Sequence, residues 1–149
     1  MLNKVLVALD GSKNSIEALH WAIKMVSGSE KAEIVAVNAQ PSFQTVHSKR
    51  MFSQADVREY QELLFEESVA EGKAILDASQ ISYTLEMLVG DPKQCIVNRV
   101  TESQDTDSPI EMVVMGSRGL GPIRAVLGGV SYGVIQAGIC PVTIIPQKD

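Results

Sequence analysis

The chain has 149 residues, of which 45% are hydrophobic and 21% are charged, the composition of an ordinary soluble globular protein. Its net charge of −5 at pH 7 argues against a nucleic-acid partner, because duplex binding needs a basic surface. Two cysteines, Cys95 and Cys140, are too few for a disulfide framework and form no CxxC pair.

The first predicted element is a strand, because "VLVAL" at residues 5–9 is an uninterrupted apolar run of the kind buried on both faces of a sheet. Asp10 ends this run, which is too short for a signal peptide or a membrane span, so we expect a cytoplasmic protein with no membrane partner. Ser12 is a candidate N-cap for a helix over residues 14–26, whose apolar side chains recur at helical spacing.

The middle of the chain alternates between strand and helix patterns. Asp91 and Pro92 are typical of a helix start, with Asp91 as the N-cap. In chain order we predict a strand at 32–39, a loop at 41–53, a helix at about 54–79, a strand at 81–90, a helix from Pro92, and an acidic connector at 102–108.

The last third begins with a strand at 110–116 that runs into the glycine-rich stretch "GSRGLGPIRAVLGGVS". A helix ending at Gly138 and a short strand at 141–146 follow. Regular alternation of strands and helices predicts one parallel sheet with helices on both faces, in a single domain over residues 1–149.

Ligands of open parallel sheets bind beyond the carboxyl ends of the strands. Three predicted strands end in suitable residues: Asp10, the pair Asn38–Ala39, and Gly116. The glycine-rich stretch that follows Gly116 leads into a helix, and backbone N–H groups with Arg118 and Arg124 favour a phosphate there. A tight strand-to-helix connection without a ligand is the alternative.

Neither of the two common phosphate motifs is present. Arg124 stands where G-x-G-x-x-G needs its third glycine, and Pro122 stands where the P-loop needs its lysine. Two histidines, His20 and His47, have no neighbours in sequence that would complete a catalytic triad.

Over nearly its whole length the chain resembles the universal stress protein family. The matching segments are "KVLVALDGSKNSIEALHWAI", "GDPKQCIV" and "EMVVMGSRGLG…LGGVS…CPVTIIP", of which the last is the most specific. The resemblance implies a doubly wound, five-stranded parallel sheet of the Rossmann-like, adenine nucleotide alpha hydrolase-like class. It also implies a homodimer formed through the last strand, at Val142, Thr143, Ile144 and Ile145.

The nucleotide-binding branch of that family carries G-x2-G-x9-G-[ST], whose backbone and final hydroxyl hold the phosphates of ATP. The resemblance therefore implies an adenine nucleotide, ATP or AMP, with Mg2+ as an accompanying ion. In this reading Asp10 meets the ribose and Arg118 adds charge for the phosphates. The other implied site residues are Ala8, Leu9 and Ala39 at the adenine, Met115, Gly116 and Gly119 at the start of the loop, and Gly128, Gly129, Val130 and Ser131 where the loop rejoins its helix.

The second half of that motif departs from the family pattern. Counting from Gly119, the closing glycine is Gly129, and Val130 follows where Ser or Thr is expected. Aligning "LGGVS" with the family's usual "LGSVS" instead places Gly129 at the hydroxyl position. The hydroxyl is absent on both alignments, and Ser131 is the residue that could replace it.

Three functions remain open from the sequence. The first is a nucleotide-binding regulatory protein of stress adaptation, with at most slow ATP hydrolysis because no general base is evident. The second is a dimeric interaction module of the same family that binds no nucleotide. The third, a nucleotidyl transferase or amidating ligase, ranks last because "LDGSKNS" carries neither an HIGH-type nor an SGGxD-type loop.

Overall fold

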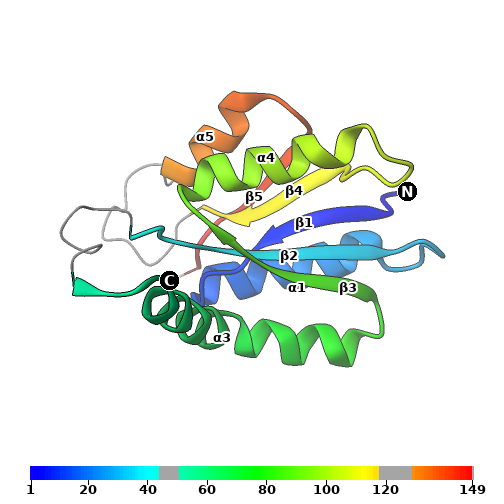
Figure 1. Ribbon diagram of the computed structural model, residues 1–149. Helices are drawn as coiled ribbons and strands as arrows, with labels where there is room; N and C mark the ends of the chain where they lie inside the picture. Colours follow the sequence, from blue (N-terminus) through cyan, green and yellow to red (C-terminus); the bar gives the residue numbers. More distant parts are fainter. Residues whose placement is uncertain (44–50, 118–128, 149) are drawn as a thin grey trace.

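Five parallel strands form one sheet at the centre of the protein (Figure 1). The computed structural model describes residues 1–43, 51–117 and 129–148. The strands are β1 (Lys4–Ala8), β2 (Glu33–Gln40), β3 (Ser82–Val89), β4 (Met112–Gly116) and β5 (Val142–Ile145). Their order is β3-β2-β1-β4-β5, and every neighbouring pair is parallel. The predicted parallel sheet is confirmed.

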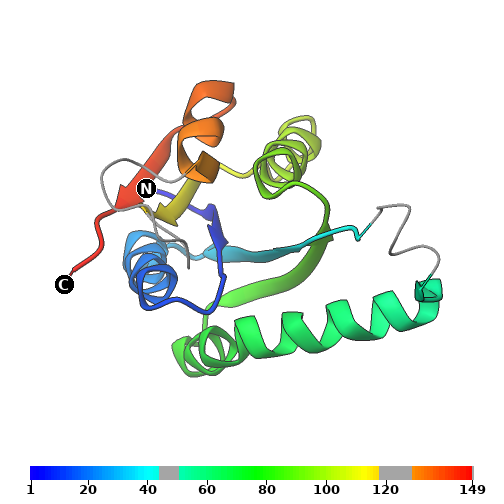
Figure 2. The same cartoon turned by 90° about the vertical axis from the view of Figure 1, so that its left-hand side faces the viewer.

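The helices cover both faces of this sheet, so the fold is doubly wound. They are α1 (Lys13–Val26), α3 (Gln54–Ser79), α4 (Pro92–Gln104) and α5 (Gly129–Ala137). Figure 2 shows α1 and α3 on one face and α4 and α5 on the other. The chain proceeds outward from β1 through β2 to β3 and then returns to place β4 on the other side of β1. The strand order therefore reverses between β1 and β4, where ligands of such sheets bind.

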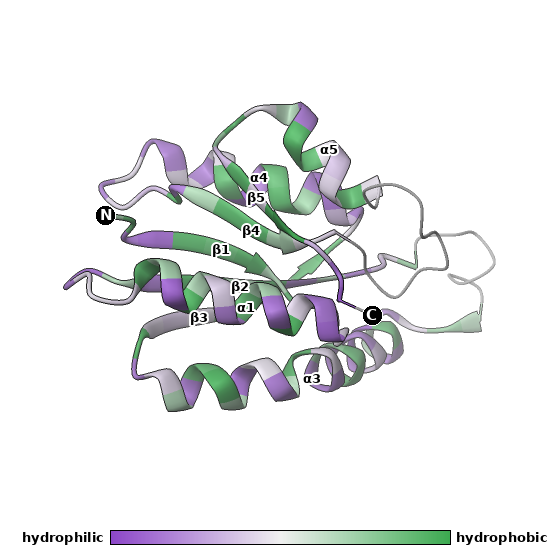
Figure 3. Cartoon of the chain, turned by 180° about the vertical axis from the view of Figure 1, so that it is seen from behind, coloured by the Kyte–Doolittle hydropathy of each residue, from purple (hydrophilic) through white to green (hydrophobic). Residues whose placement is uncertain are grey.

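The central strands are apolar along both faces because both faces are covered. Val5 and Val7 pack under α1 with Ile34, whereas Leu6 packs on the opposite face with Val35. All five are inaccessible to solvent. Figure 3 shows the hydrophobic colouring along β1 and β4 and the mixed colouring of the helices. The uninterrupted apolar runs in the sequence thus reported burial on two sides.

Local hydrogen bonds fix where the helices begin. Ser12 Oγ accepts a hydrogen bond from Ser15 N at 3.1 Å, and Asp91 Oδ2 accepts one from Gln94 N at 2.9 Å, ahead of Pro92. Both predicted N-caps are therefore confirmed. Among the described segments, no helix combines the length and the apolar composition that crossing a bilayer requires.

The edge strand β3 is tied to α4 by a two-armed ion pair. Arg99 Nε and Nη2 donate to the two carboxylate oxygens of Glu86 at 2.7 and 3.0 Å, and the side chains are 22% and 28% exposed. Hydrogen bonding from Arg99 lowers the pKa of Glu86 and outweighs the opposing effect of burial. Two parallel bonds of this kind are stronger than a single surface contact.

Replacing Glu86 with Gln should lower the free energy of unfolding by about 1 kcal/mol at pH 7, an effect limited by solvent screening of this part-exposed pair. Because the pKa is lowered in the folded state, the difference between wild type and variant is full above the ordinary glutamate pKa. It shrinks as the pH falls through the lowered value. Urea unfolding from pH 3 to 7 measures this. Glu62→Gln, which breaks the exposed Arg58–Glu62 pair, should change almost nothing, and an equal loss in both variants would contradict the prediction.

Candidate functional site

The residues predicted for the site gather at the carboxyl edge of the sheet, around the switch point. The turn after β1 holds Leu9 and Asp10, β2 carries Ala39 near its end, and β4 ends at Gly116. Of the predicted residues, the structure brings together at this edge Ala8, Leu9, Asp10, Ala39, Met115, Gly116, Gly129, Val130 and Ser131. Arg118, Gly119 and Gly128 lie outside the described residues.

The turn between β1 and α1 holds Asp10 in place. Asp10 Oδ1 accepts a hydrogen bond from Ser12 N at 2.9 Å, and Ser15 Oγ accepts one from Asp10 N at 3.4 Å. Gly11 has a φ of +85°, a conformation that suits glycine. The half-buried carboxylate therefore lies at the N-terminus of α1, with a fixed orientation, where the helix dipole favours its charge.

The backbone of Gly116 passes directly over a buried side chain of α1. A Cβ built on Gly116 would lie 2.6 Å from Asn14 Cγ, and Asn14 is 2% exposed. Asn14 Nδ2 in turn donates to Ile145 O at 3.1 Å, so this amide joins α1 to the end of β5. A close approach of two parts of the protein therefore explains this glycine. The sequence did not predict this role for Asn14. Its only indication there is that a polar residue lies beside the apolar stripe of a helix.

Ser131, in the first turn of α5, contacts the same glycine from the other side. Its Oγ donates to Gly116 O at 2.9 Å, and the residue is only 3% exposed. The hydroxyl proton is thus used within the protein, to join α5 to β4. Gly129 differs from Gly116, because no atom of the described residues lies within 4 Å of a Cβ built on it.

The backbone of Ala39 lies just past the end of the pairing between β1 and β2. Leu9 N donates to Val37 O at 2.8 Å, and the register of the two strands ends at Ala8 and Val37. Peptide groups of a parallel strand face its two neighbours alternately, so Ala39 turns its N–H and C=O toward the β1 side. There the chain has already left the sheet, and both groups face the space beyond the end of β1.

Two buried amide side chains support this corner of the sheet. Asn38 Nδ2 donates to Leu9 O at 2.7 Å, and Gln40 Nε2 donates to Asn38 Oδ1 at 2.6 Å. Both residues are less than 7% exposed. The sequence placed Asn38 at the end of a strand, but the partner of its side chain depends on where β1 ends.

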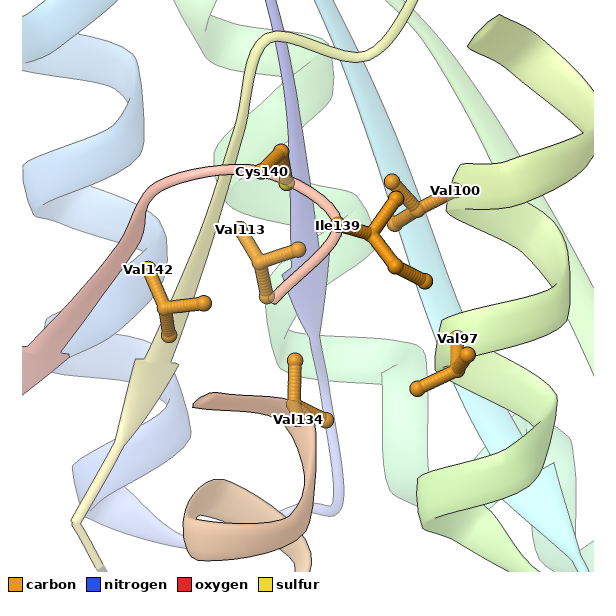
Figure 4. Close-up of a pocket in the computed structure, with 7 residues that line it drawn as sticks. All are labelled: Val97, Val100, Val113, Val134, Ile139, Cys140 and Val142. Carbon is orange, nitrogen blue, oxygen red and sulfur yellow. The ribbon is translucent and has the colours of Figure 1, made fainter. Parts of the chain in front are cut away.

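An apolar hollow elsewhere does not fit a nucleotide. It lies between α4, α5, β4 and β5, and its walls are five valines with Ile139 and Cys140 (Figure 4). Burial raises the pKa of the Cys140 thiol, which keeps it protonated at neutral pH. Within the described ranges, no group of three or more His, Cys, Asp or Glu side chains is placed to hold a metal ion.

Comparison with known proteins gives a consistent result. The model of the universal stress protein family matches residues 1–146. The universal stress protein YxiE of Bacillus subtilis is 28% identical over 153 aligned positions, which cover 97% of this chain and 99% of the relative.

Two solved structures share the fold. Protein MJ0577 superimposes with a TM-score of 0.83 at 19% identity, and the match covers 100% of this chain and 99% of the MJ0577 chain. The AMP-bound universal stress protein family protein At3g01520 of Arabidopsis thaliana gives a TM-score of 0.62 at 23% identity, covering 99% and 93%. At such identities these likenesses show the fold alone. The family match over residues 1–146 establishes that this chain belongs to the universal stress protein family.

Proposed function

We propose that this protein binds an adenine nucleotide, AMP or ATP, at the carboxyl edge of its sheet. The observation that carries the proposal is the position of Ala39, whose N–H and C=O lie side by side beyond the last pair of β1 and β2. Adenine presents an acceptor at N1 beside a donor at N6, so one residue's peptide groups can pair with both. The AMP bound to the related At3g01520 protein supports the same ligand class.

The remaining predicted residues have complementary roles in this proposal. The Asp10 carboxylate accepts hydrogen bonds from the ribose hydroxyls, which its fixed position at the start of α1 favours. The phosphates lie beside Gly116 and toward the N-terminus of α5, where Gly129 and Val130 offer backbone N–H groups. Arg118, Gly119 and Gly128 remain predicted members of this phosphate region. An accompanying Mg2+ would be held chiefly by the phosphate oxygens.

Calorimetric titration of nucleotide-stripped protein with AMP, ADP, ATP and GMP tests the proposal. We expect saturable binding of the adenine nucleotides and much weaker binding of GMP, because guanine reverses the donor and acceptor at the two positions that face Ala39. Absence of binding by all three adenine nucleotides would overturn the proposal. That result would favour the alternative function, a dimeric interaction module that binds no nucleotide. The missing hydroxyl of the glycine motif supports the same alternative.

Restoring that hydroxyl should strengthen the hold on the terminal phosphates. Gly129 stands at the hydroxyl position in one alignment, and none of the described residues places an atom within 4 Å of a Cβ built there. Gly129→Ser should therefore raise the affinity for ATP by roughly tenfold, the value of one charge-assisted hydrogen bond, and leave AMP binding unchanged. Gly129→Ala is the matched control, since it adds the Cβ without the hydroxyl. Equal affinities of the Ser and Ala variants for ATP would contradict the prediction.

We also propose that the protein acts in the cytoplasm, in stress adaptation, as a homodimer paired through β5. This strand is an edge of the sheet. Pro141 and Ile145 turn their carbonyls toward β4, so Ile144 turns its N–H outward. Ile144→Pro removes that donor and should give a monomer in analytical ultracentrifugation, whereas Ile144→Val should stay dimeric. A monomeric wild type would refute the dimer.

A further inference from the structure

The buried amide of Asn38 occupies a place that a backbone group would otherwise take. In a continued parallel pairing, the N–H of Leu9 would donate to Val37 O, and Leu9 O would accept a hydrogen bond from the N–H of Ala39. The first bond is present at 2.8 Å. In place of the second, Asn38 Nδ2 donates to Leu9 O at 2.7 Å.

The orientation of this amide is fixed by its other neighbour. Gln40 Nε2 donates to Asn38 Oδ1 at 2.6 Å, which leaves Asn38 Nδ2 as the atom that points at Leu9. Asn38 is 6% exposed and Gln40 is 4% exposed, so water does not compete for these bonds. A buried amide held at both ends is rigid, and it fixes the position of Leu9, the residue before Asp10.

We propose that Asn38 is a positioning residue for the nucleobase. By satisfying the carbonyl of Leu9, its side chain completes the end of β1 while sparing the N–H and C=O of Ala39 for a ligand. The inference rests on the proposed function, since it assigns the base to Ala39. The inference assigns Asn38 no contact with the ribose or the phosphates. A loss of binding confined to ligands that carry the base therefore distinguishes positioning of the base from a general contribution to folding.

The test compares two ligands that differ only by the base, AMP and ribose 5-phosphate, with amide chemical shifts followed by NMR so that weak binding is measurable. Asn38→Asp keeps the size of the side chain but replaces the donor to Leu9 O by a second oxygen. We expect about tenfold weaker AMP binding, the value of one well-placed hydrogen bond, and a change of less than about twofold for ribose 5-phosphate. In the wild type, the Ala39 amide resonance should shift with AMP and stay unchanged with ribose 5-phosphate.

Ser103→Ala is the matched control. Ser103 is also buried, and its hydroxyl accepts a hydrogen bond from Ile110 N ahead of β4, at the opposite edge of the sheet. This variant should be less stable than the wild type but should bind AMP with unchanged affinity. If Asn38→Asp fails to fold, Gln40→Leu provides the second variant, because it releases the Asn38 amide without placing a charge beside Leu9.

The outcomes separate the two proposals. Equal losses for AMP and ribose 5-phosphate, or no loss for either, would show that Asn38 only supports the fold and would overturn the inference. Failure of the wild type to bind AMP would instead overturn the proposed function, and the inference about Asn38 would fall with it. AMP binding by the wild type without a shift of the Ala39 amide would overturn the assignment of the base while leaving nucleotide binding intact.

Discussion

Replacing Gly116 with alanine should lower the free energy of unfolding by about 2–4 kcal/mol, because the added methyl group overpacks a filled site and disturbs a buried hydrogen bond. The new Cβ would lie 2.6 Å from Asn14 Cγ. Asn14 cannot move aside easily, since it is 2% exposed and is bonded to Ile145 O. Either this amide or the end of β4 must shift. Equilibrium unfolding in urea measures the loss.

Two further variants make the interpretation specific. Gly129→Ala changes a glycine of the same motif, but its Cβ meets no atom of the part of the chain that the structure describes within 4 Å, so its stability should stay near that of the wild type. In a double-mutant cycle, Asn14→Ala should relieve part of the cost of Gly116→Ala, giving a combined loss smaller than the sum of the single losses. Additive losses would contradict the contact between residues 116 and 14, and a fully stable Gly116→Ala protein would contradict the argument as a whole.

The sequence predicted the fold well because the relevant signals are local. Ser12 and Asp91 cap helices through residues three positions away, and the apolar run of β1 requires only that both faces of the sheet be covered. Element ends were less accurate. The strand predicted over 110–116 begins at Met112, because Ile110 is buried and apolar without belonging to the strand. Apolar character reports burial, and it does not report strand pairing.

The supporting residues of the site were not predictable in the same way. Asn14 and Ile145 lie 131 positions apart in the sequence. The residues around Asn14 therefore do not predict that its side chain lies against Gly116. The role of Asn38 depends on β1 ending one residue before Leu9, which is a property of the assembled sheet. The positions of Asp10, Ala39 and Gly116, by contrast, follow from parallel strands that end at one common edge. The roles assigned to them remain predictions.

A second large effect is expected at Gly72, on the face of α3 that meets the core. A Cβ there would lie 2.7 Å from Leu9 Cδ1 and 3.5 Å from Leu19 Cδ2. Leu9 is 2% exposed, and its backbone is bonded at both N–H and C=O, so it has little room to yield. Gly72→Ala should therefore destabilise the protein by about 1–3 kcal/mol, as overpacking of a filled core does. Because Leu9 precedes Asp10, the variant should also weaken AMP binding.

Gly133→Ala provides the contrast that tests this reasoning. A Cβ on Gly133 would overlap Lys93 Cδ and lie 2.6 Å from Lys93 Cγ, a closer overlap than that at Gly72. The lysine is exposed, however, and its chain can rotate into solvent at small cost. Replacing a glycine within α5 by alanine raises the free energy of unfolding by up to about 1 kcal/mol, because alanine has the higher helix propensity. This variant should therefore be as stable as the wild type or more stable. Thermal unfolding of both variants decides the matter. If Gly133→Ala lost as much stability as Gly72→Ala, the distance of the overlap, and not the freedom of the neighbour to move, would determine the cost.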